Sequence, residues 1–228
     1  MLISETKLND KSADLQRVYV DGYTFYPTFT SMSFGGTGIY ILSDYNCIRR
    51  DDLNIKCEGC ETTFLELPTR GNQKNMIIAA IYRHPHMNYS DFFTNFYETV
   101  EKISRKYNVI FLGDMNLDVS PMVKNKAITD YKNILSSLGL RNMISKPTRI
   151  TKTSQTTIDH VITNVPHQAI YAGILNCDVA DHLPIYALCS LNPSRCVYEG
   201  NTMYRSITSA KKMTILIHSK MKYQKLTF

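Results

Sequence analysis

Short apolar runs rich in β-branched and aromatic residues recur along most of the chain, and they set the strongest limit on its fold. Only two stretches have helical spacing instead, so strands greatly outnumber helices. A sheet-based core with helices packed on its outside is therefore predicted. Eight runs have the length and alternation typical of β-strands, namely 23–29, 38–42, 62–67, 76–82, 108–112, 157–163, 170–175 and 183–191.

The two predicted helices are amphipathic and lie between strands. Residues 90–107 place Phe92, Phe96 and Val100 at helical spacing, with Ser90 as the predicted N-cap. Residues 127–138 repeat the pattern, and Gly139 is the predicted C-terminal stop. Both helices are expected to cover a sheet with one apolar face.

Length and composition are those of a globular domain. The chain has 228 residues, 43% of them hydrophobic, which is enough to fill a sizeable core. Gly and Pro are too few for a collagenous or low-complexity chain. The longest apolar run, 76–82, is far shorter than the about 20 residues that a membrane span needs, so no membrane partner is expected.

Basic residues are concentrated at the C-terminus. Residues 193–228 hold seven Lys and Arg against one acid, and the preceding residues hold equal numbers of each sign, so the net charge of +6 belongs to this stretch. We divide the chain into a domain at 1–192 and a basic tail at 193–228, which is predicted to be a linker or disordered.

Acidic, Asn and His residues follow or precede several of the apolar runs. Side chains at strand ends project into a shared cleft, where carboxylates supply oxygen ligands for a hard cation and a general base. Each motif alone is more typical of a turn or a capped loop. The residues are Glu5 after the first run, Asp114 and Asn116 after 108–112, Asp159 and His160 within 157–163, and Asp181 and His182 before 183–191.

In this order the motifs resemble the endonuclease/exonuclease/phosphatase superfamily, and more closely the apurinic-like endonuclease domains of non-LTR (LINE-type) retrotransposons. The resemblance covers about residues 1–192. The matching stretches are SETKLND at 4–10, DGYTFY at 21–26, GGTGIYI at 35–41, AAIYRHP at 79–85, FLGDMNLD at 111–118, KPTRIT at 146–151, TTIDHVITN at 156–164 and ADHLPI at 180–185.

The resemblance implies an α/β fold, a four-layer α-β-β-α sandwich with its active site at the mouth between two sheets. Family members begin with a further strand and helix that would lie before Met1. Residues 1–4 are similar to the end of an interior strand. We therefore expect the domain to be incomplete at its N-terminus, with an open sheet edge beside this strand.

The resemblance also implies a metal and a polarised histidine. Glu5 and Asp181 are the implied metal ligands, and an all-oxygen set suits Mg²⁺ or Mn²⁺. His182 is implied to contact the scissile phosphate or the attacking water, with Asp159 as its partner.

Three further roles are implied. Asp114 orients or deprotonates the water, Asn116 holds the phosphate or the incoming hydroxide, and the Tyr82 phenol hydrogen-bonds the phosphate. Whether Asp114 or His182 is the base stays open. Tyr82 and Asn116 are thus both catalytic and substrate-binding candidates, whereas His84 and His86 are expected to be loop residues without a role.

The implied function is a metal-dependent DNA endonuclease of a retrotransposon-derived element that nicks target DNA. Its parent element would also carry a reverse transcriptase domain, and the enzyme would be intracellular, and nuclear if active. Two alternatives stay open. One is a catalytically inactive, truncated remnant, and the other is a phosphomonoesterase or lipid phosphatase of the same superfamily.

Overall fold

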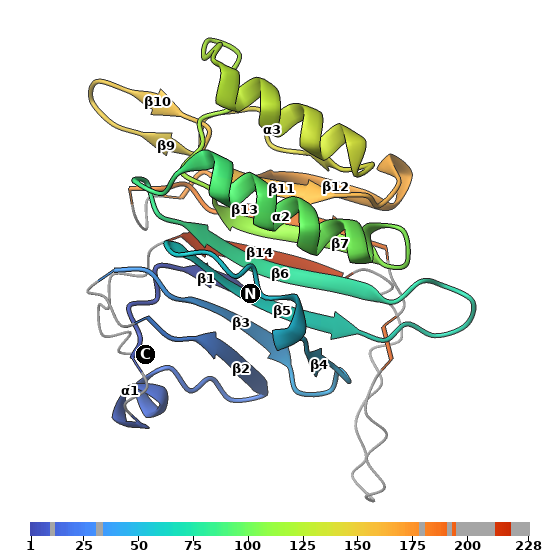
Figure 1. Ribbon diagram of the computed structural model, residues 1–228. Helices are drawn as coiled ribbons and strands as arrows, with labels where there is room; N and C mark the ends of the chain where they lie inside the picture. Colours follow the sequence, from blue (N-terminus) through green and yellow to red (C-terminus); the bar gives the residue numbers. More distant parts are fainter. Residues whose placement is uncertain (10–11, 31–33, 178–180, 191–192, 195–212, 220–228) are drawn as a thin grey trace, which may run out of the picture.

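Two six-stranded sheets pack against each other (Figure 1). The computed structural model describes residues 1–9, 12–30, 34–177, 181–190, 193–194 and 213–219. The first sheet has the order β4 (Ile48–Arg49), β5 (Cys60–Leu67), β6 (Met76–Arg83), β7 (Asn108–Asp114), β11 (Asp159–Thr163) and β8 (Arg141–Asn142). The second has the order β12 (Ile170–Ile174), β13 (Ile185–Cys189), β14 (Met213–Ser219), β1 (Leu2–Ser4), β3 (Thr37–Leu42) and β2 (Tyr23–Thr28).

All eight predicted strand runs are strands in the structure, with ends within two residues of the predicted ones. Four further two-residue strands, β4, β8, β9 (Arg149–Ile150) and β10 (Gln155–Thr156), were not predicted. Strands β9 and β10 form a hairpin that projects from the body of the molecule (Figure 1). Such short strands carry too few residues to show an alternating pattern.

Helices α2 (Tyr89–Ser104) and α3 (Lys126–Ser137) confirm the two predicted helices. The predicted Ser90 cap is wrong, because the Asn88 side chain accepts the hydrogen bond from the Ser90 backbone N–H and caps the helix two residues earlier. Asn125 caps α3 in the same way. Gly139, with φ of 68°, ends α3 as predicted.

Alternation along the strands divides the apolar side chains between two cores. One side of the first sheet faces the second sheet, and residues such as Ile78, Leu112 and Val161 form a core there with Leu2 and Ile39. This core joins the two sheets.

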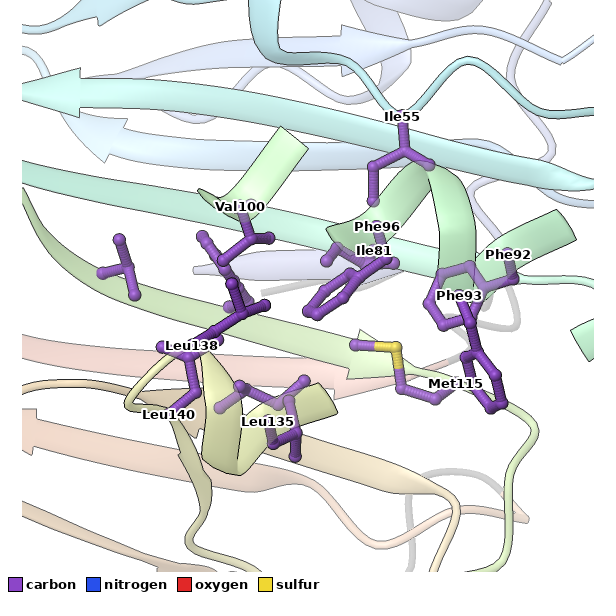
Figure 2. Packing of buried hydrophobic residues seen from close by; sticks show 14 of the residues in the cluster. Ile55, Ile81, Phe92, Phe93, Phe96, Val100, Met115, Leu135, Leu138 and Leu140 are labelled. Carbon is purple, nitrogen blue, oxygen red and sulfur yellow. The ribbon is translucent and has the colours of Figure 1, made fainter. Parts of the chain in front are cut away.

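The opposite side of the first sheet faces the helices. Phe92 and Phe96 of α2 and Leu135 of α3 pack there against Ile81 and Met115 (Figure 2). Each fully buried aromatic or leucine side chain contributes about 1.5–3 kcal/mol by leaving water. The layers are therefore helix, sheet and sheet, as expected for the α/β sandwich.

The fourth layer is represented, within the described residues, only by the short helix α1 (Ser12–Arg17). The Tyr40 hydroxyl donates to the Val18 carbonyl oxygen and ties the segment after α1 to β3. None of the described helices is long and apolar enough to cross a membrane.

Strand β1 has hydrogen-bonded neighbours on both sides. It pairs antiparallel with β3 and parallel with β14, which in turn pairs with β13. Strand β14 therefore lies where an open edge was expected. Its residues fall within the predicted basic tail, and seven residues of that tail are thus part of the sheet. Residues 195–212 and 220–228 of the predicted tail lie outside the described residues.

Candidate active site

Three polar side chains lie in a row across the first sheet. Tyr82 at the end of β6 is in register with Asp114 at the end of β7, which is in register with Asp159 at the start of β11. Side chains along a strand alternate between the two faces of the sheet, and these three lie on the face that packs against the second sheet, together with residues such as Leu112 and Val161. Neighbouring strands are about 4.8 Å apart, so the register alone brings the three side chains together in the space between the sheets.

Gly113 permits the close approach of β6 and β7 at this row. Its φ is 149°, and a Cβ at this position would lie 1.9 Å from the carbonyl oxygen of Ile81. No side chain fits there without displacing one of the two strands. The Gly-Asp order of the motif thus places the Asp114 carboxyl at the end of the sheet.

The second sheet adds Glu5 and His182. The Tyr82 hydroxyl donates to Glu5 Oε1 at 2.8 Å, and Glu5 follows β1 with a φ of 53°. His182 precedes β13, and its Nδ1 lies 2.8 Å from Asp159 Oδ2. Both contacts cross between the sheets, so this site exists only when the two sheets are packed together.

Burial makes the Asp114 carboxyl an unusually weak acid. Asp114 is 2% exposed, and its burial, with the neighbouring charge of Asp159, raises its pKa to about 7. The charge of His182 opposes this rise. A carboxyl group that ionises near neutral pH is suited to take a proton from water.

His182 and Tyr82 are held in proton-donating forms. Burial alone would lower the pKa of His182, but the hydrogen bond and charge of Asp159, with the charges of Asp114 and Asp181, raise it above its ordinary value. Burial, the hydrogen bond to Glu5 and nearby carboxylates raise the pKa of the Tyr82 phenol. The site therefore offers an imidazolium and a phenol as donors to an anion.

Asn116 has a left-handed backbone, with φ of 46°. Its backbone N–H donates to Asp114 Oδ1 at 2.9 Å, and its side-chain Nδ2 donates to the Arg83 carbonyl oxygen at 2.7 Å. One side-chain N–H is thus used to fix the orientation of the amide group. The Asn side chain is held beside the Asp114 carboxyl.

Asp181 lies apart from this cluster. Its side chain is 46% exposed and forms an ion pair with Arg149 at 3.5 Å. The groups whose ligand atoms gather within 4.8 Å of one another are Asp114, Asp159 and His182. The sequence-predicted metal ligands Glu5 and Asp181 are not members of this cluster.

The cluster nevertheless suits a divalent cation. Asp159 Oδ1 is buried and has no hydrogen-bond partner among the described residues. A buried carboxylate oxygen without a partner is costly, and either a cation or a proton on the adjacent Asp114 would satisfy it. The carboxylate oxygens of Asp114 and Asp159 are the kind of ligand that a hard divalent cation prefers, while His182 stays available as a hydrogen-bond donor.

Three residues around the site were not predicted from the sequence. His84 is in a loop, as expected, but it is buried and its Nε2 lies 2.8 Å from Glu61 Oε2. Its ring lies 5.0 Å from that of Tyr82. Arg83, between Tyr82 and His84, is fully buried. The neighbourhood of Tyr82 in the Tyr-Arg-His stretch is the only sequence signal that points to them.

Comparison with known proteins agrees with this geometry. Residues 76–186 match a family model described as endonuclease-reverse transcriptase, and this stretch contains Tyr82, Asp114, Asp159 and His182. No curated protein matches the chain.

Solved structures share the fold at low sequence identity. The endonuclease domain of TRAS1, a telomere-specific non-LTR retrotransposon, is 14% identical with a TM-score of 0.59, covering 82% of this chain and 95% of that one. The 3′ phosphatase NExo from Neisseria, bound to a product DNA hairpin, is 14% identical with a TM-score of 0.56, covering 84% and 88%. TDP2 of D. rerio, complexed with a single-strand DNA product, is 12% identical with a TM-score of 0.53, covering 80% and 82%.

The family match and the shared fold agree. Residues 76–186 match the family model, and the chain has the fold of the endonuclease/exonuclease/phosphatase superfamily, similar to that of the endonuclease domain of a non-LTR retrotransposon.

Proposed function

We propose that this protein is a divalent-cation-dependent phosphodiester hydrolase that cleaves DNA, and more narrowly a retrotransposon-type endonuclease that nicks its target. The observation that carries the proposal is the cluster of Asp114, Asp159 and His182 between the sheets. It combines a carboxyl group that ionises near neutral pH with an imidazole whose pKa the neighbouring carboxylates raise. Hydrolysis of a phosphodiester needs both a base and a cationic donor.

In the proposed reaction Asp114 accepts a proton from a water molecule as the water oxygen bonds to phosphorus. The bond from phosphorus to the opposite bridging oxygen breaks, and the leaving alkoxide takes a proton from solvent. Negative charge grows on the phosphoryl oxygens, where His182, Tyr82 and Asn116 donate hydrogen bonds. Asp159 holds the His182 ring and favours its charged form.

The residues of the site fit Mg²⁺ or Mn²⁺ as the cation. Glu5 would hold it, with Asp181 as the second ligand that the sequence suggests, and the oxygen donors of the nearby cluster suit a hard cation. When bound, the cation would stabilise charge on the phosphoryl and leaving oxygens.

DNA is the proposed substrate because the fold is shared with proteins whose structures hold DNA products. The match to an endonuclease-reverse transcriptase family favours the retroelement reading over a phosphomonoesterase or lipid phosphatase. Under this proposal the parent element supplies a reverse transcriptase, and the enzyme works on chromosomal DNA in the nucleus.

A supercoiled-plasmid assay tests the proposal. The purified chain is incubated with plasmid in Mg²⁺, in Mn²⁺ and in EDTA, and hydrolysis of a phosphomonoester is measured beside it. Nicked circles are expected with either metal and none with EDTA, and Glu5→Ala and Asp181→Asn are expected to abolish nicking. Nicking that persists in EDTA would remove the metal mechanism, and phosphomonoester hydrolysis without nicking would replace the proposed substrate.

A further inference from the structure

Arg83 is a buried cation next to the candidate active site. Tyr82 faces the space between the sheets, so Arg83, the next residue of β6, faces the helix side. Its side chain has no exposed surface. No ion pair joins it to a carboxylate in the part of the chain that the structure describes. An unpaired buried charge is unfavourable unless other groups stabilise it.

Backbone carbonyl groups take the place of a counterion. The guanidinium donates from Nε to the Met115 oxygen at 2.7 Å, from Nη2 to the Asn116 oxygen at 2.8 Å, and from Nη1 to the Met87 oxygen at 2.8 Å. Its central carbon also lies 4.5 Å from the centre of the Tyr89 ring. All three nitrogens are therefore committed to one arrangement of the surrounding backbone.

Two of these carbonyl groups belong to the loop that carries the candidate catalytic residues. Asn116 returns a hydrogen bond, from its Nδ2 to the Arg83 carbonyl oxygen, and its left-handed backbone needs such support. The Met115 side chain packs between the helices and the sheet (Figure 2). The loop is thus fixed by Arg83 and by the core at once.

We propose that Arg83 is a positioning residue for the hydrolysis. Its planar guanidinium holds the 114–116 loop so that the Asn116 side-chain amide faces the substrate phosphate and the Asp114 carboxyl faces the attacking water. This inference rests on the proposed function. Lysine does not replace Arg83, because a single ammonium group does not reach three carbonyl oxygens in a planar fan.

The test compares Arg83→Lys with a matched variant, Arg50→Lys. Unlike Arg83, Arg50 is only partly buried and is bound by acidic residues. One of its partners, Glu66, is in register with Ile77, at the other end of β6 from Tyr82. Arg83→Lys is expected to lower kcat about 100-fold with KM within about threefold of wild type, because small displacements of catalytic groups reduce the rate more than binding. Arg50→Lys is expected to leave kcat within about twofold. Rates are divided by the folded fraction from thermal melts.

A double-mutant cycle with Asn116→Ala separates positioning from general stability. If Arg83 acts through Asn116, the double variant is little slower than Asn116→Ala alone. Rate losses that multiply, or an Arg83→Lys loss that disappears after correction for the folded fraction, would overturn the proposal.

Hydrogen exchange provides a readout that does not depend on cleavage. The backbone N–H of Asn116, which donates to Asp114 Oδ1, is expected to exchange faster in Arg83→Lys than in Arg50→Lys, while the backbone N–H groups of β6 and β7 keep their protection. Equal exchange in the two variants would contradict the inference. If the wild-type chain does not cleave DNA at all, the proposed function fails, and this exchange result alone decides whether Arg83 holds the loop.

Discussion

Two Asp-His dipeptides, at 159–160 and 181–182, reach opposite electrostatic states in this protein. Both histidines are buried, His160 with no exposed surface and His182 with 2%. Burial lowers the pKa of His160 to about 4, whereas the pKa of His182 is raised above its ordinary value. The surroundings therefore favour the neutral form of the His160 ring and the charged form of the His182 ring.

The partners of the two rings account for the difference. His160 Nδ1 lies 2.9 Å from the Tyr131 hydroxyl, and its Nε2 lies 3.1 Å from the Leu117 carbonyl oxygen. An Nε2–H tautomer that accepts from the phenol satisfies both contacts without a charge. His182 instead contacts the carboxylate of Asp159. The state of a buried histidine thus follows from its partner more than from its burial.

The carboxylate that contacts His182 comes from the other Asp-His dipeptide. Asp159 of the first dipeptide holds His182 of the second, because successive residues of β11 face opposite sides of the sheet. Asp159 faces the second sheet, and His160 faces helix α3. One dipeptide is thus divided between the candidate site and the helix-side core.

Substitution of the two histidines, one at a time, should give the largest difference in kcat between variants. His182→Ala is expected to lower kcat about 1,000-fold, because the site loses its cationic donor in the transition state, while DNA affinity changes little. His160→Gln, the matched buried variant, is expected to keep kcat within about tenfold once corrected for folding. Single-turnover cleavage and fluorescence anisotropy measure the two quantities. Equal losses of rate and affinity in His182→Ala would make it a binding residue only.

Removing the shared carboxylate should move the pH dependence of cleavage. In Asp159→Asn, His182 loses the hydrogen bond and the charge that oppose the effect of burial most strongly. Its pKa should therefore fall, so the basic limb of the pH–rate profile moves to lower pH. The acidic limb should move the same way, because Asp114 loses a neighbouring negative charge. We expect kcat at pH 7.5 to fall about 100-fold. A profile that keeps its limbs would contradict the assigned contact.

His160 should make the fold sensitive to acid. Its pKa is about 4 in the folded protein and about 6.5 when unfolded, so only the unfolded chain binds this proton between those values. The free energy of unfolding therefore falls as the pH decreases from about 6.5 to about 4, by roughly 3 kcal/mol.

The raised pKa of Asp114 gives a slope of the opposite sign, since the folded state binds that proton more tightly. Subtracting the urea-unfolding free energies of His160→Gln from those of the wild type removes this shared contribution. A difference that does not depend on pH would show that His160 does not titrate as described.

Tyr131→Phe should have the smallest effect. The variant removes the hydroxyl that donates to His160 Nδ1 and leaves a buried acceptor without a partner, which costs about 1–2 kcal/mol. Urea unfolding at pH 7 measures this loss, and the cleavage rate of the folded protein should not change. A loss of activity at unchanged stability would mean that the His160 side of the sheet takes part in the chemistry.

The strands, the helices and most residues of the site could be predicted from the sequence, whereas their contacts could not. Runs of apolar and β-branched residues located β6, β7 and β11, because both faces of these strands are buried. The row of Tyr82, Asp114 and Asp159 depends on strand register, which is fixed by pairing between distant segments.

The same limit applies to β14 and Arg83. Strand β14 was assigned to a basic tail because residues 193–228 hold the net positive charge of the chain, although it pairs between β1 and β13. Apart from its place next to Tyr82, Arg83 gave no signal of its burial, since an Arg beside a strand end is ordinarily exposed. Its partners are backbone carbonyl groups, which every sequence has and which no sequence pattern reveals.

Single-turnover cleavage of a labelled DNA duplex by the wild type and by Asp114→Asn tests the central claim most directly. The substitution keeps the shape of the side chain but removes the group whose pKa is about 7. We predict metal-dependent cleavage by the wild type that rises through pH 7, and a rate at least about 1,000-fold lower for Asp114→Asn with unchanged DNA affinity. Cleavage by Asp114→Asn at the wild-type rate, with the same pH dependence, would contradict the account.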